Sequence, residues 1–65
     1  MRLIFYGKLA IDQRAGEEAV VIALDPDEAR ALLGSDQWEL DPLGAAYDHH
    51  PSGIVSRVRV VLALP

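Results

Sequence analysis

Two adjoining elements are predicted by residues 19–34, which read AVVIALDPDEARALLG. The first six of these residues are all apolar and three are β-branched, a pattern typical of a central strand covered on both faces. We therefore place a strand near residues 18–24. The rest of the stretch carries the start and end signals of a helix, so the chain is expected to pass directly from a strand into a helix.

The helix is predicted over residues 26–33. Asp25 suits the N-cap, Pro26 suits the first helical position, and Glu28 stands at the capping-box position three residues after the cap. Gly34 is the natural end because glycine adopts the left-handed conformation that closes many helices. A helix of about two turns is unstable alone, so we expect it to pack on a sheet.

Alternation of apolar and polar residues predicts two further strands, near residues 2–11 and 54–64. The polar residues and glycine of 12–16 predict a turn, which would make the first two strands a hairpin. In the last strand, valines and leucines alternate with arginines. We expect Val60 and Leu62 to lie on its inward face.

Residues 36–50 can form either a strand or a loop. They contain two short apolar patches, 38–40 and 45–47, and the second could pair with the last strand through the turn at Pro51. The predicted fold is therefore a single α+β domain over residues 1–65. It has a small antiparallel sheet of three or four strands, with one short helix on one face, in the order β-β-α-(β)-β.

Composition excludes several classes of protein. The chain has no cysteine, which excludes disulfides and thiolate metal sites. Hydrophobic residues make up 51% of the chain, unlike the composition of disordered proteins. No apolar run approaches the ~18–20 residues needed to cross a bilayer. A cytoplasmic location is the expectation.

We expect no enzyme activity and no cofactor. None of the three serines has, at a recognisable sequence spacing, a base to activate it and a third group to orient that base. Neither standard glycine-rich phosphate-binding loop is present. The tripeptide Asp48-His49-His50 has metal-like chemistry, but adjacent side chains on a strand point to opposite faces. We interpret it as a polar turn, so the sequence predicts no catalytic, cofactor or metal site.

Charge is distributed unevenly along this chain. Nine acids and one base lie between Glu17 and Asp48, which gives −8, whereas the remaining residues give +4 and the total is −4. Three of these acids are explained by capping of the helix. The other six, with two aromatic residues among them, are the predicted partner-binding residues: Glu17, Glu18, Asp36, Trp38, Glu39, Asp41, Tyr47 and Asp48. The alternative is a solvated surface that keeps a small protein soluble.

In size, acidic charge and absence of a catalytic constellation, the chain resembles the small inhibitors encoded by phages and mobile elements, of which anti-CRISPR proteins are an example. The resemblance implies a DNA mimic that blocks a basic nucleic-acid-binding surface of a nucleic-acid-guided effector complex. Carboxylates such as Glu39, Asp41 and Asp48 would supply the charge, and Trp38 would be the desolvated anchor. The expected partner is a protein with a basic surface, with no direct binding to nucleic acid and none to a membrane.

Two other classes stay open. An immunity protein or antitoxin would present the same acids to the basic active site of a toxin. A structural oligomerisation module would instead use its strand edges and its apolar last strand, and a homodimer is one form of that hypothesis.

Overall fold

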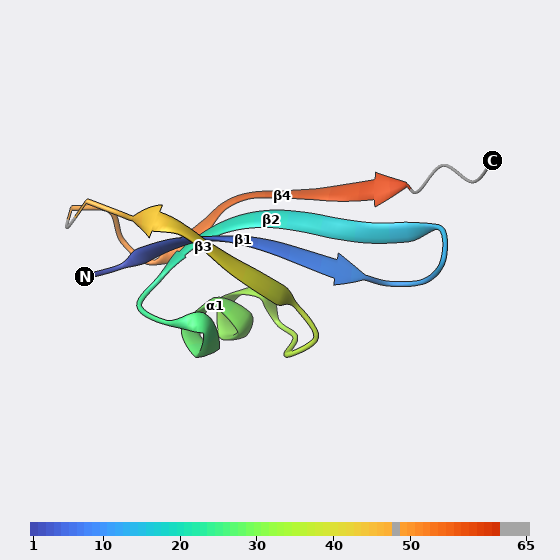
Figure 1. The fold of residues 1–65 in the computed structure, drawn as a ribbon, viewed down its shortest axis with the longest axis horizontal. Helices are drawn as coiled ribbons and strands as arrows, with labels where there is room; N and C mark the ends of the chain where they lie inside the picture. The colour runs from blue at the N-terminus through green and yellow to red at the C-terminus, as the bar shows by residue number, and fades with distance from the viewer. Residues whose placement is uncertain (48, 62–65) are drawn as a thin grey trace.

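The computed structural model describes residues 1–47 and 49–61. Its elements are β1 (Leu3–Ala10), β2 (Ala15–Ala23), α1 (Pro26–Leu33), β3 (Glu39–Ala45) and β4 (Gly53–Val61). The strands form one antiparallel sheet in the spatial order β3-β1-β2-β4. Helix α1 lies against one face of this sheet, here called the helix face, and the hairpin of β1 and β2 projects beyond it (Figure 1). The opposite face, here called the open face, is covered by no helix of the described residues.

The first two strands form the predicted hairpin. Phe5 of β1 lies opposite Val21 of β2, and both are buried against the helix. Asp12 fixes the turn because its carboxylate accepts hydrogen bonds from the backbone N–H groups of Arg14 and Ala15, at 2.7 and 2.8 Å. A local Asx interaction therefore helps to set the pairing of β1 with β2.

The predicted start and end of the helix are confirmed. Asp25 accepts a hydrogen bond from the backbone N–H of Glu28 at 2.7 Å, and Glu28 accepts one from the backbone N–H of Leu24 at 2.9 Å. Pro26 is the first helical residue, and Gly34 closes the helix with a φ of 85°. These side chains satisfy backbone groups that a short helix would otherwise leave unpaired.

The core lies between α1 and the helix face. Ala29 and Leu33 of the helix pack against Phe5, Val21 and neighbouring small residues. The core residues, all under a tenth exposed, are Phe5, Ala19, Val21, Ala23, Ala29, Leu33 and Trp38.

Two details of the predicted sheet differ in the structure. The third strand is Glu39–Ala45 and pairs with β1. The sequence had left residues 36–50 open as a strand or a loop, with residues 45–47 as a candidate to pair with the last strand. The inward placement of Val60 was also wrong. Val60 lies opposite Gly16, on the open face, and Leu62 lies outside the described residues. Alternation shows which residues share a face, but not which face the helix covers.

Arg57 takes the place on β4 that an apolar residue was expected to fill. It lies opposite Ala19 on the helix face, and its guanidinium donates a hydrogen bond to the carbonyl oxygen of Leu33 at 3.2 Å. No helix among the described residues is long and apolar enough to cross a membrane.

Candidate functional site

The structure does not bring the eight predicted partner-binding residues together. Those on the open face are Glu18, Glu39 and Asp41. Glu17 lies on the helix face, and Asp36 lies in the loop after α1. Trp38 is in the core, Tyr47 is exposed beyond the end of β3, and Asp48 lies outside the described residues.

Trp38 is a core residue, and its prediction as an exposed anchor was wrong. Only 1% of it is exposed, and its ring packs so closely on β1 that a Cβ added at Gly7 would lie 3.0 Å from it. Arg57 stacks over the indole with its guanidinium 5.4 Å from the ring centroid. A tryptophan among acids gives no indication of exposure, because the largest apolar side chain of a small domain is also its best core residue.

The open-face acids surround two residues of β1. Lys8 lies between Glu39 on β3 and Glu18 on β2, and opposite residues of antiparallel strands share a face with Cβ atoms ~5 Å apart. Two residues before Lys8 on β1, Tyr6 lies opposite Asp41 of β3. We call Glu18, Glu39 and Asp41 the acidic patch.

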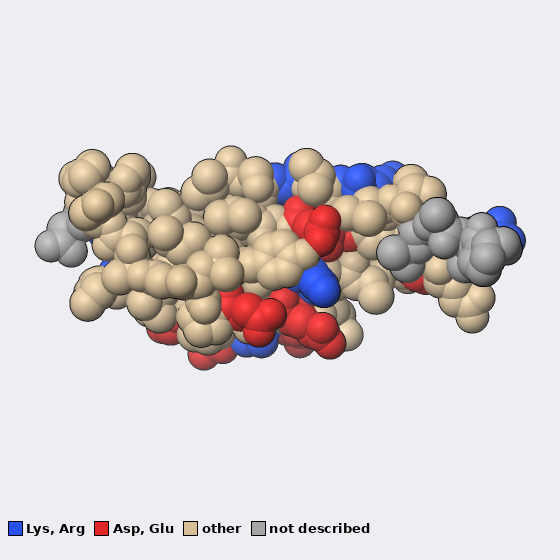
Figure 2. All heavy atoms as spheres, turned by 45° about the horizontal axis from the view of Figure 1, so that its top comes forward, with Lys and Arg blue, Asp and Glu red and all other residues tan. Residues whose placement is uncertain are grey.

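The patch has one partly compensating cation. Lys8 shares the open face with the three carboxylates, and its Nζ lies 5.9 Å from the centroid of the Tyr6 ring. Among the described residues it forms no ion pair with them. Figure 2 shows acidic and basic groups side by side near the middle of the molecule, whereas the surface over the end of β3 and the start of β4 is mostly uncharged. Three carboxylates against one ammonium leave this part of the sheet negative.

Tyr6 reports the negative field of the patch. Its hydroxyl donates a hydrogen bond to the carboxylate of Glu18, which raises the pKa of the phenol, and partial burial raises it further. The charges of Glu18 and Asp41 act in the same direction. Tyr6 is therefore a neutral donor that fixes Glu18, while Glu39 and Asp41 are exposed and available to a partner.

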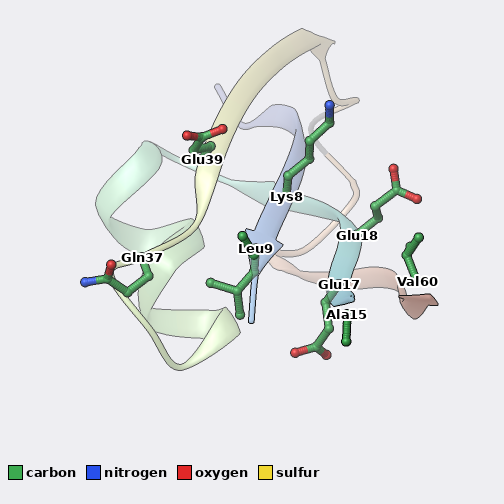
Figure 3. Close-up of a pocket in the computed structure, with 10 residues that line it drawn as sticks. Lys8, Leu9, Ala15, Glu17, Glu18, Gln37, Glu39 and Val60 are labelled. Carbon is green, nitrogen blue, oxygen red and sulfur yellow. The ribbon is translucent and has the colours of Figure 1, made fainter. Parts of the chain in front are cut away.

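Glu17 has a structural role on the opposite face. It accepts a hydrogen bond from Arg57 Nε at 2.9 Å, and this bond lowers the pKa of its carboxyl and raises the pKa of Arg57. The ion pair joins β2 to β4. Glu17 is thus engaged within the molecule, and adjacent Glu17 and Glu18 serve different faces because side chains alternate along a strand. In Figure 3, Lys8 and Glu18 project to one side of the strands and Glu17 projects to the other.

A hollow of about 390 Å³ borders the acidic patch near the hairpin. Its lining includes Lys8, Glu18 and Glu39 together with Leu9 and Val60 (Figure 3). Among residues 1–47 and 49–61, no three histidine or carboxylate side chains are grouped so that they could hold a metal ion. The lining of the hollow combines charged side chains with apolar ones.

The open face also carries an apolar area that was not predicted from the sequence. Ile4, Val20 and Ile22 form it, and with Tyr47 and Val55 they line a second hollow of about 290 Å³. The continuous apolar run of β2 contained the signal, because such a run places hydrophobic side chains on both faces. Only one of those faces is covered by the helix, so the other remains available for contact.

No protein family, curated protein or solved structure matches this chain.

Proposed function

We propose that this protein is a non-enzymatic binding module whose open sheet face contacts a basic surface of another protein. The observation that carries the proposal is the acidic patch, three carboxylates on a face that no helix of residues 1–47 and 49–61 covers, in a chain with a net charge of −4. Complementary charge steers a partner to such a face and suppresses partners of the wrong sign. The apolar area beside the patch supplies surface that gains from being removed from water.

The specific form of the proposal is an inhibitor of the anti-CRISPR type. Glu39 and Asp41 lie two positions apart on β3, so their Cα atoms are ~7 Å apart, and Glu18 lies two strands away, ~10 Å across the sheet. This strip of negative charge would occupy a channel lined with lysine and arginine that otherwise holds nucleic acid. The apolar contact comes from the area around Val20, since Trp38 is buried.

A charge-reversal experiment with a matched control tests the role of the patch. The test variant is Glu39→Lys/Asp41→Lys, and the control is Asp27→Lys/Asp36→Lys, whose sites lie on the helix and the loop that follows it. Each substitution adds two units of charge, so both variants change the net charge from −4 to zero. DNA binding by a purified nucleic-acid-guided effector complex is measured with each protein added, at low and at high salt.

The patch variant should lose inhibition, and the control variant should keep it. High salt should abolish inhibition by the parent chain and by the control, because salt screens the electrostatic attraction between the carboxylates and the basic surface. If both variants lose inhibition equally, net charge alone is responsible and the patch is not a site. If neither the parent chain nor the control inhibits DNA binding, the effector complex is excluded as the partner. Capture of a single small basic protein from cell lysate, lost only in the patch variant, would then favour the antitoxin hypothesis.

A further inference from the structure

The outer edge of β4 is a second candidate interaction surface, separate from the acidic patch. β4 pairs with β2 on one side, and its other side is an edge of the sheet. Every residue from Ile54 to Arg59 is exposed, and so is Val61 at the end of the strand. Valines are prominent along it: 62% of Val55, 53% of Val58 and 77% of Val61 lie open to solvent. A long apolar edge strand is a ready template for pairing with another chain.

The other edge of the sheet, β3, is protected against such pairing. Pro42 has no backbone N–H to donate, and the register with β1 shifts between Ile4 and Phe5, which leaves Leu43 unpaired as a bulge. β4 is two residues longer and contains no proline. Its own register shift lies near Val55, at its start, and leaves residues 56–61 regular. The sheet therefore has one blocked edge and one edge that can accept a strand.

Self-pairing of this edge is disfavoured in its central registers. Arg57 and Arg59 both lie on the helix face of β4, because they pair with Ala19 and Glu17. If two copies paired about a two-fold axis at Arg57 or at Arg59, that arginine would lie opposite its own copy. If the axis lay at Val58, Arg57 of each copy would lie opposite Arg59 of the other. Like charges directly opposite each other destabilise strand pairing, so the two arginines act against self-association in the registers centred on residues 57, 58 and 59.

We propose that the outer edge of β4 receives an extended segment of a partner protein, with acidic side chains facing Arg59 and apolar side chains facing Val58 and Val60. On the inner side of β4, β2 already places an acid opposite this arginine, because Glu17 pairs with Arg59 on the helix face. Arg57 is committed to Glu17 and to the carbonyl of Leu33, whereas Arg59 makes no side-chain hydrogen bond or ion pair among the described residues. Arg59 is thus the residue that selects an acid on the incoming strand.

Two designed peptides of about seven residues, the length of an ordinary strand, test this proposal. One alternates glutamate with valine, and the other alternates lysine with valine. Each is added to the intact chain, affinity is measured by NMR titration, and hydrogen exchange is followed at the backbone amides of β4. The glutamate peptide should bind more tightly and should slow exchange at alternate amides of residues 56–61.

Arg59→Glu should weaken binding of the glutamate peptide on the order of threefold to tenfold, because an attractive cross-strand pair becomes repulsive. The same variant should bind the lysine peptide more tightly than the parent does. Arg14→Glu, the same charge change in the exposed hairpin turn, should leave the peptide preference unchanged.

Three results would overturn the proposal. They are equal binding of the two peptides by the parent chain, slowed exchange confined to β3, and a dimer in light scattering with β4 amides already protected before any peptide is added. The last result would make a second copy the occupant of the edge.

A glutamate peptide methylated on alternate backbone nitrogens should fail to bind, since strand addition depends on main-chain hydrogen bonds.

Discussion

Truncation of Trp38 should remove much of the stability of this domain. The side chain is 1% exposed, so Trp38→Ala takes an entire indole out of the core, a change that costs about 3–5 kcal/mol. Loss of the stacked Arg57 guanidinium adds about 0.5–1 kcal/mol. A domain of this length is stable by only about 3–10 kcal/mol in total. Trp38→Ala should therefore lose about a third or more of this stability, and its urea midpoint should fall steeply.

Trp38→Phe separates packing from hydrogen bonding at the same position. The indole Nε1–H is buried without a hydrogen-bond partner among the described residues, and a donor buried in that way costs about 1–3 kcal/mol. Phenylalanine removes this donor and keeps an aromatic ring, so part of the packing loss is offset and Trp38→Phe should destabilise the domain less than Trp38→Ala does.

Urea unfolding followed by far-ultraviolet circular dichroism measures both variants, because the substitutions remove the chain's single tryptophan fluorophore. Tyr47→Ala is the control, since this aromatic residue is 75% exposed and its loss should change the unfolding free energy by less than about 0.5 kcal/mol. A folded Trp38→Ala protein with an unchanged midpoint would show that the indole lies outside the core, and the reasoning would fail.

Three further predictions concern stability. Gly7→Ala should cost about 1–3 kcal/mol in the same urea assay, because its Cβ would lie only 3.0 Å from the buried indole ring. Asp25→Ala should cost about 0.5–2 kcal/mol through the lost N-cap, and an unchanged thermal midpoint would contradict the capping role. Folding lowers the pKa of Glu17 through its hydrogen bond with Arg57, and it lowers the pKa of Glu28 through a hydrogen bond from a serine hydroxyl. At acidic pH the unfolded chain therefore binds more protons than the folded chain does, and stability should fall as the pH drops below about 4.3. Glu17→Gln should flatten this pH dependence of the urea midpoint, and a slope identical to the parent's would argue against the ion pair.

Some features of the molecule were determined by the sequence alone, and they are all local. Asp25, Pro26, Glu28 and Gly34 fixed the helix bounds because each acts on backbone groups within four residues of itself. Alternation of apolar residues gave the first strand of the hairpin, since side chains on a strand repeat every two positions, and a continuous run rich in β-branched residues gave the second.

The tertiary structure alone decided the features that depend on distant parts of the chain. Residues 39–45 became a strand because β1 offered a free edge to pair with, which no local pattern in ELDPLGA indicates. Trp38 entered the core because Gly7, 31 positions earlier, leaves room for its ring. The acids divided between two faces once the helix covered only one of them, so Glu17 is held in an ion pair while its neighbour Glu18 joins an exposed patch. Which face a side chain serves is set by what packs on the sheet, and periodicity within a strand carries no information about that.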